Sequence, residues 1–71
     1  MRIFALRVTE MRNELKLTIP EMARKSGIPE KTIYHWERGE RIPKIDSLKK
    51  LCDYFNCSAD FLIGRTDEER W

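Results

Sequence analysis

Residues 19–38, with the sequence IPEMARKSGIPEKTIYHWER, constrain the fold more than any other stretch of the chain. Their pattern predicts two short helices joined at Gly27, and the residues expected to face inward are Met22, Ala23, Ile33 and Trp36. Helices joined this closely cannot lie antiparallel, so they must cross steeply. The crossing requires a small residue, which Ala23 supplies, and a left-handed turn, which Gly27 adopts without steric cost. The sequence therefore predicts a helix-turn-helix motif over residues 19–38.

One face of the second predicted helix is not expected to pack into the core. The side chains on this face are expected to be Glu30, Lys31, Tyr34, His35 and Arg38. All of them form hydrogen bonds and most of the charged ones are basic, which suits a nucleic-acid groove.

The chain before the motif predicts one further helix. Apolar residues at helical spacing favour a helix from Ile3 to Leu15, and those expected to face inward are Phe4, Val8, Met11 and Leu15. Arg7 lies on the opposite side and is expected to be solvated. Leu17 is expected to pack inward ahead of the motif. Thr18 and Glu21 have capping-box spacing, so the motif's first helix should begin at Ile19 and end near Ser26.

The chain after the motif predicts two more helices. The motif's second helix, which follows Pro29, should run to about Arg38, where Gly39 stops it. The first of the two further helices should begin near Ile45 or Asp46. Its apolar positions are Leu48, Leu51, Cys52 and Phe55, and Asn56 is the expected left-handed cap.

A last short helix is predicted between Ser58, its cap, and Gly64, with Phe61 and Leu62 facing inward. The remaining residues have no periodicity and are expected to be a frayed tail that ends at Trp71. The sequence thus predicts an all-α domain over residues 1–66, which contains the motif, and a tail over residues 67–71.

Length and composition limit what this chain can be. With 71 residues it forms one small domain, whose core contributes only a few kcal/mol of net stability. Cys52 and Cys57 lie among apolar residues, so they are expected to be reduced core thiols; a disulfide or redox pair is the alternative. The apolar run before Arg7 is too short for a signal peptide, and no segment is long enough to span a membrane. We therefore expect a cytoplasmic protein.

Charge is unevenly distributed along the chain. The formal net charge is only +2, but residues 1–44 carry a net +4 and residues 45–71 a net −2. The positive part contains the predicted motif, so this asymmetry would orient the domain toward a polyanion. The alternative is the ordinary scatter of a solvated surface.

Four segments together resemble the DNA-binding domain of the phage repressor and Cro group, also called the XRE family. They are the motif itself, RVTEMRNELKLT before it, WERGERIP after the recognition helix, and SLKKLCDYFNCSADFLIG at the end. The resemblance covers about residues 3 to 64. It implies a compact five-helix, lambda-repressor-like fold that binds double-stranded DNA in the major groove. It also implies a homodimer on a palindromic operator, for which Phe61, Ile63 and Trp71 are candidate contacts.

The resemblance also implies which residues contact bases. In the family, the first two residues of the recognition helix and the residue four places after the second contact base edges. These positions are Glu30, Lys31 and His35, and Tyr34 lies beside them. Lys31 is suited to guanine, Glu30 to the cytosine amino group, His35 to a guanine or a phosphate, and the Tyr34 ring to a thymine methyl. The alternatives are that Glu30 only complements the helix dipole and that Lys31 only adds solubility.

Phosphate contacts are expected from the start of the motif and from the link after it. The candidates are Thr18, Thr32, Arg38, Arg41 and Lys44. The chain departs from the family at three positions. Ile19 replaces a common glutamine, Lys16 a common helix-ending glycine, and Pro29 a common serine cap.

Two residues are assigned a structural role. In the family an arginine at the Arg12 position pairs with a glutamate at the Glu37 position, which would fix the recognition helix against the first helix. Trp36 is expected in the core, and a base-stacking platform is the alternative.

The sequence contains no metal set, phosphate loop or nucleophile with a base, so neither an enzyme nor a cofactor is expected. The expected function is that of a transcriptional regulator, specifically a repressor. The alternative is an antitoxin that neutralises a partner toxin and represses its own operon. Acidic residues near the C-terminus would then meet a basic partner; they are Asp60, Asp67, Glu68 and Glu69.

Overall fold

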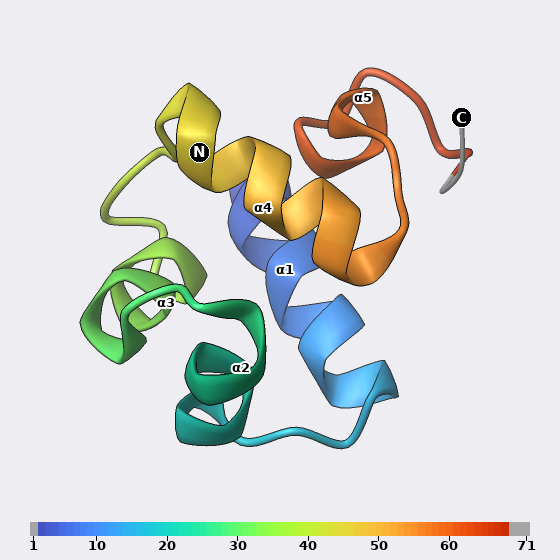
Figure 1. The fold of residues 1–71 in the computed structure, drawn as a ribbon. Coiled ribbons are helices and arrows are strands. Elements are labelled where there is room, and N and C mark those ends of the chain that lie inside the picture. Colours follow the sequence, from blue (N-terminus) through green and yellow to red (C-terminus); the bar gives the residue numbers. More distant parts are fainter. Residues whose placement is uncertain (1, 69–71) are drawn as a thin grey trace.

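The computed structural model describes residues 2–68, and every regular element in this range is an α-helix. The helices are α1 (Arg2–Glu14), α2 (Ile19–Ser26), α3 (Glu30–Glu37), α4 (Ile45–Phe55) and α5 (Ala59–Leu62). Figure 1 shows α1 near the centre, with α2 and α3 to its lower left and α5 at the opposite side. Helix α1 packs against α3 and α5, while α2 packs against α3 and α4. The predicted all-α, five-helix fold is confirmed.

The core forms where the inward faces of all five helices meet. Its fully buried members include Phe4, Met22, Ile33, Leu51 and Leu62, one from each helix. Trp36 is also buried. Its ring meets that of Phe4 edge to face, with 5.6 Å between the centroids. The prediction that Trp36 is a core residue is therefore confirmed.

The end of α1 differs from the prediction at Leu15, which is 50% exposed and does not face inward. The helix stops at Glu14 because Lys16 adopts a left-handed conformation, with φ at 57°. The turn brings the backbone N–H of Leu17 back to the carbonyl of Arg12, at 3.2 Å. Leu17 takes the inward position, so Lys16 serves here as the helix-ending residue although it is not glycine.

The limits of α2 agree with the prediction. The Thr18 hydroxyl accepts from the Glu21 backbone N–H and the Glu21 carboxylate accepts from the Thr18 N–H, which is the predicted capping box. At the other end Gly27 has φ at 78°, a conformation that a residue with a Cβ adopts at a cost. The steep turn between α2 and α3 therefore forms as the sequence predicts.

The capping box makes the stability of α2 depend on pH. The hydrogen bond from the Thr18 N–H, 2.9 Å long, holds the pKa of the Glu21 carboxyl below its usual value. A depressed pKa adds stability above the unfolded pKa of about 4.3, and this is lost as pH falls through the folded pKa. The urea midpoint of Glu21→Ala should therefore lie below that of the original chain at pH 7, and the difference should shrink by pH 3. For Glu10→Ala, an exposed position on α1, the difference should not shrink in this way.

The later helices also follow the prediction, with small differences at their ends. Helix α3 ends at Glu37, one residue early, with Arg38 as its cap. Pro29 precedes it and gives no side-chain cap. Asn56 has φ at 54° and ends α4, as predicted. The Ser58 hydroxyl caps α5 by accepting from the backbone of that helix.

Arg7 is not the solvated charge that the sequence indicated. Its guanidinium donates to the carbonyls of Phe61 and Thr66, each at 2.7 Å, and to the Asp67 carboxylate at 2.9 Å. It also lies 4.1 Å from the centroid of the Phe61 ring. Helical periodicity predicted a solvent-exposed Arg7 because it takes no account of contacts with residues far away in the sequence. Thr66 and Asp67 are therefore fastened to α1, whereas Glu69 and Trp71 lie outside the described residues.

Cys52 and Cys57 are both buried and form no disulfide with each other. Burial raises the pKa of the Cys52 thiol, which keeps it protonated and unreactive at neutral pH. The prediction of reduced core thiols is confirmed. Among the helices of residues 2–68, none combines the length and the apolar character needed to cross a membrane.

Candidate nucleic-acid interface

One face of α3 is exposed because the opposite face is anchored in the core. Ile33 and Trp36 are buried, whereas Glu30, Lys31 and Tyr34 are exposed. These three side chains therefore lie on the face that the sequence assigned to base contacts. The predicted contacts themselves stay a prediction, because the structure holds no DNA.

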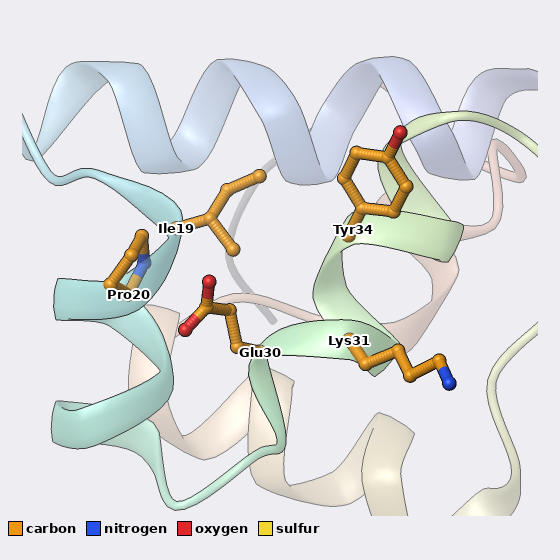
Figure 2. Close-up of a pocket in the computed structure, with 5 residues that line it drawn as sticks. All are labelled: Ile19, Pro20, Glu30, Lys31 and Tyr34. Carbon is orange, nitrogen blue, oxygen red and sulfur yellow. The ribbon is translucent and has the colours of Figure 1, made fainter.

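A shallow hollow of about 480 Å³ lies between the start of α2 and this face of α3. The residues that line it are Ile19, Pro20, Glu30, Lys31 and Tyr34. Figure 2 shows Ile19 pointing toward the space before Tyr34, with the Glu30 carboxylate between the two helices and Lys31 extending away. The hollow thus offers apolar surface beside one carboxylate and one ammonium group.

His35 is less exposed than the sequence indicated, since its side chain is 26% accessible. Its Nδ1 lies 2.7 Å from Oε1 of Glu40, and a carboxylate can only accept, so Nδ1 carries the proton. No buried side-chain nitrogen or oxygen in residues 2–68 lacks a hydrogen-bond partner. Within residues 2–68, the hydrogen bond of the His35 ring to Glu40 is made by Nδ1 and not by Nε2. His35 therefore keeps one ring nitrogen for a ligand.

Arg38 lies beside the same carboxylate, with Nε 3.2 Å from Oε2 of Glu40. Its guanidinium also lies 5.3 Å from the centroid of the Tyr34 ring. The two neighbours raise the pKa of Arg38, and the hydrogen bonds from His35 and Arg38 lower the pKa of Glu40. One carboxylate thus bridges a predicted base contact and a predicted phosphate contact.

The other predicted phosphate contacts fall into two places. Thr32, Arg41 and Lys44 line one hollow of about 260 Å³, together with parts of α3 and the following link. Thr18 lies apart, at the start of α2, where its hydroxyl is already used in the capping box. The structure therefore brings three of the five candidates together.

The predicted pair of Arg12 and Glu37 is present. Nε of Arg12 lies 2.7 Å from Oε2 of Glu37, and Nη2 lies 2.9 Å from Oε1, so the contact is bidentate. Nη1 donates to the carbonyl of Leu17 at 2.8 Å. The hydrogen bond with Glu37 raises the pKa of Arg12. This pair ties the end of α3 to the end of α1, which fixes the orientation of the exposed face.

Two residues of this surface were missed by the sequence analysis. Glu40 was treated only as part of the link, and Ile19 only as a lost contact. Glu40 lies past the end of α3, where helical periodicity says nothing about direction. The signal that was available is Gly39, because a left-handed glycine after a helix turns the following residue back along it.

Comparisons with known proteins agree with this architecture. A family model described as helix-turn-helix matches residues 8–62. The chain is 34% identical over 61 residues to the HTH-type transcriptional regulator ImmR of Bacillus subtilis, covering 86% of this chain and 48% of that protein. It is 31% identical over 64 residues to AnsR, another HTH-type transcriptional regulator of Bacillus subtilis, covering 90% and 55%.

An uncharacterized HTH-type transcriptional regulator of Archaeoglobus fulgidus is 32% identical over 65 residues, which cover 92% of this chain and 93% of that protein. This chain spans about half the length of the Bacillus subtilis relatives. No solved structure matches it. The match to the family model covers most of the chain, and residues 2–68 form the five predicted helices. The chain therefore belongs to the XRE family of helix-turn-helix proteins.

Proposed function

We propose that this protein binds double-stranded DNA in the major groove through α3 and regulates transcription as a repressor. The observation that carries the proposal is the exposed face of α3, which is held outward by Ile33 and Trp36. The names of its relatives as transcriptional regulators support it. DNA as the ligand implies a cytoplasmic protein. Selection of bound duplexes from a random pool at physiological salt tests the proposal, and recovery of no common sequence would refute it.

In this proposal base reading belongs to Glu30, Lys31, Tyr34 and His35. Lys31 donates to guanine O6 and N7, and Glu30 accepts from the amino group of cytosine. The only apolar group in the major groove is the thymine methyl, and the apolar side of the hollow beside Tyr34 is suited to it. Ile19, at the position of the family's glutamine, adds to this apolar surface.

Affinity in this proposal comes mainly from phosphate contacts. The candidates are Thr18, Thr32, Arg38, Arg41 and Lys44. One copy touches only a few base pairs, so specific regulation requires two copies on a palindrome, with half-sites about one helical turn apart. Phe61 and Ile63 are the candidate dimer contacts within the described residues, although Phe61 is half-buried beneath Arg7.

Base reading and phosphate binding give different mutational signatures. Lys31→Ala should cost about 1–3 kcal/mol on the selected site and relax preference at one base position. Arg41→Ala should weaken all sequences alike and lower the salt slope by about one. Titrations of a selected and a random duplex over a range of salt measure both. Equal losses on both duplexes from Lys31→Ala would show that Lys31 contacts only the backbone.

An antitoxin is the second candidate. Two of the acidic residues proposed to meet the partner already form ion pairs within the domain. Asp67 binds Arg7, and Oδ1 of Asp60 lies 3.9 Å from Nε of Arg65. Glu68 is exposed, and Glu69 lies outside the described residues. A small basic protein that co-purifies from the native host would favour this function.

A further inference from the structure

We infer that Glu40 determines the specificity of this surface, by fixing the orientation of the His35 ring and by competing with DNA phosphates for Arg38. The inference rests on the proposed function, since it assumes that α3 faces DNA. Glu40 then has two separable effects on DNA binding. One acts on base preference through His35, and the other acts on binding to any sequence through Arg38.

The backbone of Glu40 is fixed by the turn that ends α3. Gly39 has φ at 75°, and its N–H donates to the carbonyl of Trp36 at 3.0 Å. The N–H of Glu40 then donates to the carbonyl of His35, also at 3.0 Å. This is the paired hydrogen-bond pattern of a Schellman turn, which folds the chain back along its own helix. The carboxylate of Glu40 therefore starts from a fixed point beside His35 and Arg38.

The contact with His35 selects one orientation of the imidazole. Nδ1 is directed at Oε1 of Glu40, so Nε2 is the ring nitrogen left for a base edge. Without the carboxylate, either nitrogen can turn toward the groove, because the two edges of the ring are similar in shape. Glu40 thus acts as a positioning residue for His35, and its loss should relax base preference at one position.

The contact with Arg38 opposes binding to phosphate. The side chains of Arg38 and Glu40 are 56% and 45% exposed, so this ion pair is open to exchange with a DNA phosphate. The carboxylate occupies the Nε donor of Arg38 and offsets its charge, so a phosphate gains less from this guanidinium, and the negative charge of Glu40 also lies near the duplex. Every sequence presents phosphates, so this cost falls on random DNA as well as on the operator. The operator alone gains from a correctly oriented His35.

The test uses Glu40→Gln, which keeps the shape of the side chain and removes its charge. Binding to a duplex selected from a random pool and to a random duplex of equal length is measured over a range of salt. Each is measured for the original chain, for Glu40→Gln, for His35→Ala and for the double variant. Glu10→Gln is the matched control, because it removes the same charge from an exposed position on α1.

Glu40→Gln should bind random DNA about two- to fivefold more tightly, the range set by the strength of an exposed ion pair. Its salt slope should steepen by about 0.9, since Glu40 no longer offsets the charge that Arg38 brings to a phosphate. Binding to the selected duplex should gain less, so the ratio between the two falls, and preference should relax at one base position. In the His35→Ala background the gain should be equal on both duplexes. Thermal unfolding should show each variant folded.

Three results would overturn the inference. The first is an equal gain from Glu10→Gln, which would indicate a general charge effect. The second is an unchanged ratio for Glu40→Gln. The third is a fall in the ratio that persists without His35. In these cases the original chain still prefers its selected duplex and the proposed function stands; if it prefers no duplex at all, both proposals fail.

Discussion

Trp36→Ala should remove a large part of the protein's free energy of unfolding, because it removes the largest side chain of the core. Truncation of a buried tryptophan costs about 3–5 kcal/mol, and a 71-residue domain has about 0.05–0.15 kcal/mol of stability per residue. The lost contacts include the edge-to-face contact with the Phe4 ring, so α3 would be released from α1 as the core opens. Urea unfolding followed by circular dichroism measures the cost, and DNA binding should fall with the folded fraction.

The matched control for this prediction is Tyr34→Ala, an aromatic truncation on the exposed face of the same helix. It should cost less than about 1 kcal/mol of stability, since most surface changes have small effects. Under the proposed function it should alter DNA binding while the chain remains folded. If instead Trp36→Ala keeps its stability and loses DNA binding, Trp36 would be a base-stacking residue and the assignment of faces on α3 would be reversed.

The helices were predictable because local rules decide them in this chain. The capping box at Thr18 and Glu21 and the left-handed turn at Gly27 set both ends of α2 within a few residues of sequence. The inward positions of Ile33 and Trp36 follow from helical spacing alone. Leu15 shows the limit of that spacing, because it continues the apolar pattern one residue beyond the end of the helix.

The parts that sequence did not predict depend on contacts between distant residues or across turns. Arg7 is bound by carbonyls from the far end of the chain, and no local pattern near Arg7 indicates them. Glu40 lies close to His35 in sequence, but its direction is set by the turn at Gly39. The exposed face of α3 was therefore predicted correctly in outline, while the hydrogen bonds that orient His35 and Arg38 are seen only in the three-dimensional structure.

Removal of one partner from the pair between Arg12 and Glu37 is the second large effect that we expect. The side chains are only 16% and 10% exposed, so Glu37→Ala leaves a guanidinium that is largely buried and has lost its carboxylate. Breaking a buried pair in this way costs about 3–5 kcal/mol, and the remaining exposure favours the lower end of this range. Urea unfolding measures the loss, which should be much larger than that for a neighbouring exposed pair.

Arg38→Met supplies that comparison, because Arg38 and Glu40 form an ion pair near the same end of α3 and their side chains are about half exposed. Its loss should cost less than about 1 kcal/mol. The double variant Arg12→Met with Glu37→Leu should recover much of the stability lost in Glu37→Ala, since apolar side chains of similar size leave no unpaired charge.

Recovered stability does not imply recovered function in this double variant. The bidentate contact fixes the angle at which α3 leaves α1, and apolar contacts have no preferred direction. We therefore expect the stable double variant to bind its selected duplex less tightly while it binds random DNA as before. If selected binding is fully restored together with stability, then packing alone orients the recognition helix, and the ion pair contributes only to the free energy of folding.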